Sequence, residues 1–260
     1  MAGDKRPRAP GIAGNELAII MRPGQKRSLL QIPCRERAMA EKLTHQFGGT
    51  SRPLTHDWTQ SQKPHTPIRV GRHLEIVGEP VKAPKSGGRT RLVIPAAGAF
   101  GTGEHATTAM SLRLLEEATR KLPPGWRLLD AGTGTGILAL AARHLGAGEV
   151  MGLDNDPRAV AHARQNARLN RISRASFAHG DVLKWRPTSR YDIITANLFS
   201  ELLIAALPRF RRALRGGGQL IISGILREQA AAVERALDRS GFQLRKKRRR
   251  GKWVALLAGL

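Results

Sequence analysis

From Thr107 onward, short apolar runs alternate with longer stretches in which apolar residues recur every three or four positions. The short runs are typical of strands buried on both faces, and the longer stretches of amphipathic helices. Their alternation predicts an α/β domain with a mostly parallel sheet covered by helices. The expected strands are 126–131, 149–154, 176–179, 191–196, 219–223, 242–244 and 253–257, and the expected helices are 107–121, 137–145, 157–170, 200–214 and 227–239.

Three glycines, at 216–218, are expected to break the chain between the helix from Ser200 and the strand from Gln219. The first part of the chain has a weaker pattern. Residues 1–14 are basic and rich in Gly and Pro, which predicts a disordered tail. A short strand at 16–21 and a helix at 35–46 predict a small α+β module over residues 15–54. Residues 55–95 are expected to be a linker with strands at 73–77 and 90–94, leading into the main domain at 96–260.

The charge of the chain is unusual, because 44 Lys and Arg residues stand against 20 Asp and Glu, a formal net charge of +24. Such a surface attracts polyanions, nucleic acid first, through counterion release. A general Arg bias at solvated positions is an equally good explanation. The basic run Arg245–Arg250 lies between two apolar runs, so we expect a strand end or hairpin there. Aromatic residues make up only 4%, which argues against a stacking platform for single strands.

The remaining composition indicates the compartment. A single cysteine, Cys34, excludes a disulfide framework within the chain and fits a reducing cytosol. No apolar run follows the first charged residues, and no stretch approaches the roughly 20 apolar residues of a membrane span. We therefore expect a cytoplasmic protein. No nucleophile triad or cluster of metal ligands is apparent in the sequence, so no metal site is expected.

A glycine-rich turn follows the first strand of the main domain, in Asp130-Ala-Gly132-Thr-Gly134-Thr-Gly136. Glycines let the backbone approach a ligand closely, and the helix N-terminus behind them offers free N–H groups. A dinucleotide fingerprint would need glycine where Ile137 stands, whereas G-x-G-x-G is the pattern of methyltransferases. Asp130 either reaches an amino group of the ligand or stabilises the turn. The alternative is a tight strand–helix turn without a ligand.

Polar residues end the next three strands. Asp154 can accept hydrogen bonds from both hydroxyls of a ribose, while Asp156, just before Pro157, is expected to cap the next helix. Asp181 can accept from an adenine amine or stabilise a turn. Asn197 ends an apolar strand, where it can hold an accepting amine, contact the ligand or cap the following helix.

A further glycine-rich loop, Phe100-Gly-Thr-Gly103-Glu-His105-Ala-Thr107-Thr108, leads into a helix whose first turn carries two threonine hydroxyls. Such a loop can fold over a ligand and close its pocket. A capped helix with a flexible entry is the alternative. His105 could assist a deprotonation or be a structural histidine.

Together these motifs resemble one family, the bacterial ribosomal protein L-eleven methyltransferases (PrmA-like), over about residues 57–260. The resemblance implies a Rossmann-like, doubly wound, seven-stranded methyltransferase sheet with a small N-terminal α+β extension that serves in substrate recognition. It also implies S-adenosylmethionine as cofactor and methyl transfer to lysine and N-terminal amines of a large-subunit ribosomal protein. The segments that carry it are 100–108, 132–138, 154–157, 196–198 and 223–226.

The same resemblance implies cofactor contacts at Thr108, Gly132, Asp154 and Asn197, to which the glycine turn adds Gly134. The expected reaction is direct displacement at the sulfonium methyl by a neutral amine, which Asn197 would meet. Two other classes stay open. A ribosomal or transfer RNA methyltransferase fits the net charge, although Leu-Phe-Ser follows Asn197 where base-methylating enzymes commonly have Pro-Pro-aromatic. A non-catalytic ribosome-assembly factor could keep the fold, although intact glycines and Asp154 favour cofactor binding.

Overall fold

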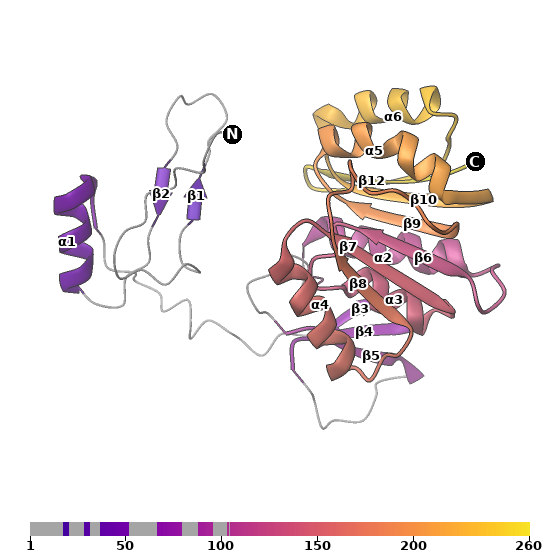
Figure 1. Cartoon of the computed structure of the whole chain (residues 1–260), viewed down its shortest axis with the longest axis horizontal. Helices are drawn as coiled ribbons and strands as arrows, with labels where there is room; N and C mark the ends of the chain where they lie inside the picture. The colour runs from indigo at the N-terminus through magenta and orange to yellow at the C-terminus, as the bar shows by residue number, and fades with distance from the viewer. Residues whose placement is uncertain are drawn as a thin grey trace. The chain divides into compact units, whose positions relative to one another are not determined.

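The computed structural model describes residues 18–20, 29–31, 37–51, 67–79, 88–95, 103 and 105–260. The chain divides into two compact units, Met1–Gln62 and Lys63–Leu260 (Figure 1). None of the helices in the described ranges is long and apolar enough to cross a membrane.

The first unit contains a strand pair and one helix. Strands β1 (Ala18–Ile20) and β2 (Leu29–Gln31) pair antiparallel, and helix α1 spans Arg37–Phe47. The expected strand at 16–21 and helix at 35–46 are confirmed with slightly different ends. The pattern did not predict β2, because three residues are too few to show a period.

A seven-stranded sheet forms the second unit, in the order β11-β12-β10-β9-β6-β7-β8 (Figure 1). All neighbours pair in parallel except β12, which is antiparallel to both β10 and β11. The expected doubly wound, mostly parallel sheet is therefore confirmed. Its strands are β6 (Arg127–Ala131), β7 (Glu149–Asp154), β8 (Ala175–His179), β9 (Tyr191–Asn197), β10 (Leu214–Leu226), β11 (Gln243–Arg250) and β12 (Trp253–Gly259).

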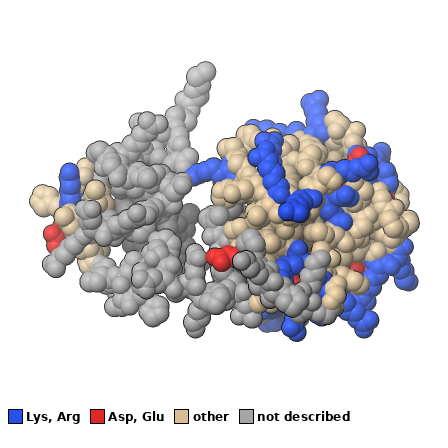
Figure 2. Space-filling view, turned by 90° about the horizontal axis from the view of Figure 1, so that it is seen from below, with Lys and Arg blue, Asp and Glu red and all other residues tan. Residues whose placement is uncertain are grey.

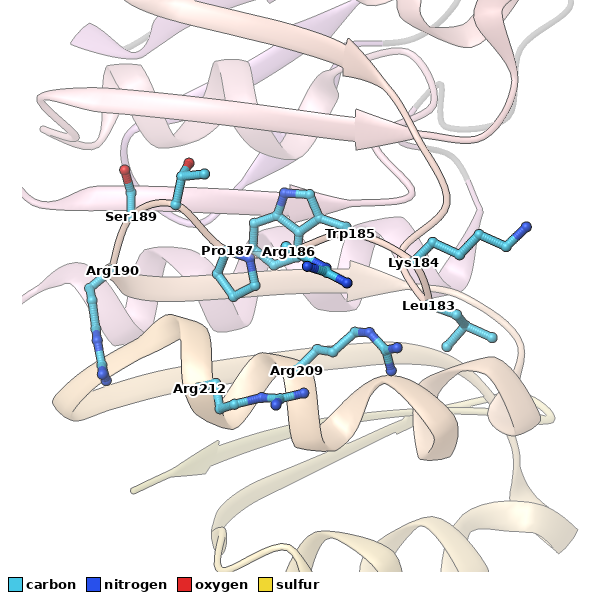
Figure 3. A pocket seen from close by; sticks show the side chains of 10 residues that line it. Leu183, Lys184, Trp185, Arg186, Pro187, Ser189, Arg190, Arg209 and Arg212 are labelled. Carbon is cyan, nitrogen blue, oxygen red and sulfur yellow. The ribbon is translucent and has the colours of Figure 1, made fainter.

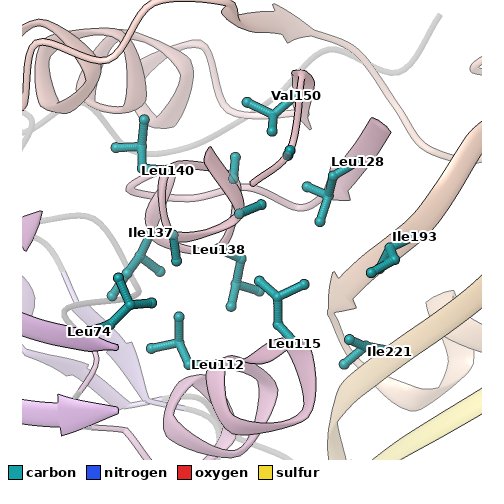
Figure 4. Packing of buried hydrophobic residues seen from close by; sticks show 14 of the residues in the cluster. Leu74, Leu112, Leu115, Leu128, Ile137, Leu138, Leu140, Val150, Ile193 and Ile221 are labelled. Atoms are coloured by element: carbon teal, nitrogen blue, oxygen red, sulfur yellow. The ribbon is translucent and has the colours of Figure 1, made fainter. Parts of the chain in front are cut away.

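Two hydrophobic clusters explain why the inner strands are apolar along their whole length. Successive residues of a strand point to opposite faces, so Leu128 of β6 enters one cluster and Leu129 the other. Figure 4 shows Leu112 and Leu138 packed in the first cluster. Helices α2 (Ala106–Thr119), α3 (Ile137–His144) and α4 (Pro157–Leu169) build the first cluster, and α5 (Ser200–Ala213) and α6 (Ala230–Arg239) the second.

A three-stranded sheet packs against the first cluster. It consists of β3 (Ile68–Val70), β4 (Leu74–Val77) and β5 (Thr90–Val93), with β4 antiparallel to β3 and parallel to β5. Leu74 and Ile76 are buried in the same cluster as α2 and α3. Asn170, just beyond α4, donates to the backbone oxygen of Val93 and accepts from its N–H, both at 2.7 Å. These strands are thus built into the larger unit.

One expectation about the chain after α5 was wrong. The glycines at 216–218 lie inside β10, which begins at Leu214 directly after the helix. The pairing of β10 with β9 shifts between Leu214 and Gln219, so the intervening residues form an irregularity within the strand. Glycine tolerates such a bulge, and the later residues of β10 are held by β9 and β12 on either side. The expected strand end or hairpin at Arg245–Arg250 is confirmed, because these residues end β11 and Lys246–Arg250 pair with β12.

Candidate active site

The strand order reverses between β6 and β9, since β7 and β8 follow β6 in one direction and β10 follows β9 in the other. In sheets of this kind, ligands bind outside the carboxyl ends of the strands at this switch point. The ends of β6, β7 and β9 carry the glycine turn, Asp154 and Asn197 respectively. The topology therefore brings the residues expected from the sequence to one edge of the sheet.

The glycine turn adopts a backbone that other residues would strain to reach. Gly132, Gly134 and Gly136 have φ values of 72°, 54° and 81°, in the left-handed region. A Cβ on Gly132 would also lie 2.4 Å from the Leu198 side chain, so β6 and the segment after β9 approach closely here. Gly136 precedes α3 and has no side chain to cap it, while the backbone of Ala139, in the first turn of that helix, hydrogen-bonds to the carboxylate of Asp130.

Asp154 connects the second strand to the glycine turn. Its Oδ2 accepts a hydrogen bond from the Gly134 N–H at 2.9 Å, and its Oδ1 accepts from the Asp156 N–H at 3.0 Å. Each carboxylate oxygen keeps a second lone pair, so hydroxyl donors can still bind there. Asp156 in turn accepts from the Arg158 N–H at 2.9 Å and caps α4, as expected.

Asp130 lies beneath the turn and is completely buried. The hydroxyls of Thr133 and Thr195 each donate to its carboxylate at 2.7 Å. Burial raises the pKa of Asp130 to about 6, the two hydroxyl hydrogen bonds oppose this, and the charge of Asp154 adds to it. Of the two roles considered for Asp130, these contacts are those of a residue that stabilises the turn.

We expect Asp130→Asn to raise stability at neutral pH. The folded-state pKa of about 6 lies above the ordinary value of 3.8, so the folded state binds more protons than the unfolded state between these values. The free energy of unfolding of the wild type therefore falls by up to about 3 kcal/mol as the pH rises from about 4 to about 6. It stays at this lower value above about pH 6. Asparagine keeps the shape without ionising. Urea unfolding at several pH values should show an advantage for the variant at pH 7 that disappears near pH 4. A difference that does not change with pH would contradict this.

Asn197 faces the start of α2. Its Nδ2 donates to Thr107 Oγ1 at 3.2 Å and lies 3.5 Å from Thr108 Oγ1, and both threonines are buried. His105 Nδ1 is 2.7 Å from the same Thr107 oxygen. The possibility that Asn197 caps α5 was wrong, because Phe199 occupies the N-cap position and no side chain caps this end. Asn197 still belongs to β9, where it pairs with Ser223, two residues too early to cap the helix.

Other expected features have mixed outcomes. Asp181 accepts from the Leu183 N–H at 2.8 Å, the contact of a turn residue. The expected lid at 100–108 rests on the glycines Gly98, Gly101 and Gly103, of which Gly98 and Gly101 lie outside the described residues, so it stays a prediction. In the part of the chain that the structure describes, no group of three or more His, Cys, Asp or Glu residues could hold a metal ion.

The site also contains two residues to which the sequence analysis assigned no role. Ser223 Oγ lies 3.4 Å from the Thr107 backbone oxygen and links β10 to α2. Phe199 has 77% of its surface exposed, directly beyond the segment that carries Asn197. An aromatic residue immediately before a helix that begins at the ligand edge is the signal that could have identified it.

Comparison with known proteins supplies a family. The model of the family "Ribosomal protein L11 methyltransferase (PrmA)" matches residues 31–259. A ribosomal protein L11 methyltransferase of Lacticaseibacillus paracasei is 38% identical over 202 residues, which cover 77% of this chain and 63% of the relative. Another, from Desulforapulum autotrophicum, is 45% identical over 163 residues, 62% of this chain and 53% of the relative. The chain thus spans less than two thirds of the length of these two relatives.

A solved structure with the same family name also shares the fold of this chain. The crystal structure of ribosomal protein L11 methylase from Lactobacillus delbrueckii subsp. bulgaricus is 33% identical to this chain, with a TM-score of 0.67. The match covers 74% of this chain and 97% of that chain.

Proposed function

The chain belongs to the ribosomal protein L11 methyltransferase (PrmA) family, and from this premise we propose that it methylates lysine and N-terminal amines of ribosomal protein L11 with S-adenosylmethionine. The observation that carries the proposal is the convergence of the glycine turn, Asp154 and Asn197 at the switch point of the sheet. The relatives that match this chain carry that name, and the solved L11 methylase shares the fold.

The residues present fit the cofactor. When bound, S-adenosylmethionine supplies a methyl group on a positively charged sulfur. Asp154 has lone pairs available for ribose hydroxyls at the end of β7, beside the backbone of Gly134. The close backbone at Gly132 and the start of α3 suit the carboxylate end of such a molecule. Thr108 lies beside Asn197 at the same edge and is proposed as a further contact.

Asn197 is proposed to orient the accepting amine. Its Nδ2 is engaged by Thr107, while no hydrogen bond from a residue in the described ranges reaches its Oδ1. That oxygen can accept a hydrogen bond from an N–H of the incoming amine. The lone pair of the amine nitrogen then points away from Asn197, toward the methyl group. A lysine amine, with a reference pKa near 10.4, must lose its proton before it can react. The contribution of the chain is then positioning and not covalent catalysis.

We further propose that the protein acts in the cytoplasm on a ribosomal protein that is held close to ribosomal RNA. A chain of net charge +24 repels a free basic protein, whereas RNA attracts this chain. The same charge favours a second candidate, methylation of RNA itself. A third, a non-catalytic assembly factor, would keep cofactor binding without transfer. The role of residues 15–54 in substrate recognition stays part of the proposal.

The test is methyl transfer from tritiated S-adenosylmethionine to fractionated ribosomes and to purified ribosomal protein. Label should enter a large-subunit protein. Asp154→Ala should weaken cofactor binding about 10- to 150-fold, the equivalent of about 1.5–3 kcal/mol for hydrogen bonds at a charged group. Asp156→Ala, which changes the neighbouring acid that only caps α4, is the matched control and should leave cofactor affinity unchanged.

Each alternative has its own signature in this experiment. Label found only in RNA would replace the proposal by the second candidate. Cofactor binding by calorimetry without transfer to any fraction would favour the third candidate.

A further inference from the structure

The connection between β8 and β9, residues 180–190, contains no helix, in contrast to the connections through α3, α4 and α5. It packs through Val182 and Trp185 on the cluster that α5 and α6 cover. Where a helix would otherwise lie, a groove of about 800 Å³ remains between this connection and α5 (Figure 3).

Half of the ten residues that line this groove are cationic, and none is acidic. The connection contributes three cations and the last turns of α5 contribute two, and Trp185 of the connection also lines the groove (Figure 3). Within the described ranges, the structure gives none of the five an ion-pair partner, and Arg190 donates instead to the Leu214 backbone oxygen at 3.1 Å. The five cations are Lys184, Arg186, Arg190, Arg209 and Arg212.

The most basic run of the sequence offers a contrast. Lys246 and Arg248 of β11 both pair with Glu117 of α2, and Lys247 pairs with Glu234 of α6. Although burial alone raises the pKa of Glu117, hydrogen bonds and charges from Lys246 and Arg248 outweigh it and lower that pKa. Three of the six cations of Arg245–Arg250 are therefore ion-paired within the fold, with two carboxylates between them. In Figure 2, Lys and Arg side chains are scattered over the described surface among uncharged residues, with few acidic side chains.

From this arrangement we infer that the groove between residues 180–190 and α5 binds the phosphate backbone of RNA. Guanidinium groups match phosphate oxygens in two-pronged hydrogen bonds, and uncompensated charge in a concave wall strengthens the local potential. An indole in the same groove adds a surface for a base or ribose. The combination of unpaired arginines, an aromatic ring and a net charge of +24 favours RNA over an acidic peptide.

The groove is separate from the candidate active site. Arg190 directly precedes β9, whereas Asn197 ends this strand, and Arg209 and Arg212 lie near the end of α5, away from its start at Ser200. RNA in the groove would lie along the face of the sheet that α5 covers, from the connection after β8 toward the amino end of β9, while the active site at the carboxyl end of β9 meets a protein amine. Only the choice of ribosomal RNA as the natural ligand rests on the proposed function.

The test is fluorescence anisotropy with a short fluorescein-labelled RNA hairpin and no cofactor. Arg209→Ala/Arg212→Ala should weaken binding about tenfold or more and reduce the slope of log affinity against log salt by about 1.4–1.8, since each of the two phosphate contacts contributes about 0.7–0.9. The matched control Arg249→Ala/Arg250→Ala removes two exposed charges from β11 and should change affinity less than about twofold. Lys184→Ala/Arg186→Ala, on the connection, provides a second groove variant that leaves α5 intact.

Equal weakening by groove and control pairs would overturn the inference, because only net charge would then matter. Unchanged affinity in both groove variants would also overturn it, and so would competition by poly-glutamate as effective as that by RNA. Methyl transfer to free ribosomal protein should be unchanged in the groove variants. RNA binding without transfer by the wild type would contradict the proposed function alone, and transfer without groove-dependent RNA binding would contradict this inference alone.

Discussion

Asn197→Ala should lower the turnover number about 100-fold, the usual loss when one preorganised polar contact to the reacting groups is removed. The affinity for S-adenosylhomocysteine should stay within about threefold of wild type, because an interaction made mainly in the transition state appears in the rate. The reason is structural. Thr107 engages the Nδ2 of Asn197, which leaves Oδ1 as the atom for the proposed contact with the amine. Turnover at saturating cofactor and calorimetry with S-adenosylhomocysteine measure the two effects.

Thr107→Val is the companion variant for this prediction. It removes the oxygen that receives the Asn197 amide but keeps the branched shape of a buried side chain. The amide should then lose its fixed orientation, and turnover should fall by less than in Asn197→Ala. If Asn197→Ala instead weakens S-adenosylhomocysteine binding and leaves turnover at saturation unchanged, Asn197 is a cofactor contact and not the residue that meets the amine.

The sheet, and Asp154 and Asn197 at the ends of its strands, could be predicted because each depends on a pattern within a few neighbouring residues. The strand at 149–154 is apolar along most of its length since both faces are buried, and its expected ends agree with β7. Asp154 and Asn197 stand out as polar ends of such strands. The rule that ligands bind at the carboxyl ends of strands selects the edge of the sheet at which the glycine turn, Asp154 and Asn197 converge.

The rest depends on contacts between residues far apart in the sequence. The hydrogen bond from Asn197 to Thr107 joins residues 90 positions apart, and no periodic pattern contains this information. Glu117, which forms ion pairs with two cations of β11, lies 129 positions before the nearer of them. From the sequence alone, the basic run Arg245–Arg250 therefore suggests a binding surface, although three of its side chains form ion pairs within the fold. The groove at 180–190 was missed because its cations come from two separate segments.

Gly224→Ala should lower the free energy of unfolding by about 3 kcal/mol or more, the combined effect of a left-handed backbone and an overpacked contact. Gly224 has a φ of 87° and lies between Ser223 and Ile225, where the pairing of β10 with β12 shifts. A Cβ there would lie 2.4 Å from the backbone oxygen of Leu198. Backbone atoms cannot rotate away as a side chain can, and the Leu198 N–H is bonded to the Ser223 oxygen at 3.1 Å.

The displaced segment is the one that carries Asn197, so turnover should fall together with stability in Gly224→Ala. Gly251→Ala is the matched control, because Gly251 also has a positive φ, of 57°, but a Cβ there would have no neighbour within 4 Å. This control should cost only about 1–2 kcal/mol for the left-handed backbone and leave turnover unchanged. Urea unfolding and saturated turnover of both variants separate the two effects. An equal loss of unfolding free energy in the two variants would show that β10 does not need the close approach to Leu198. An equal effect on turnover would show that the bulge at Gly224 does not fix the position of Asn197.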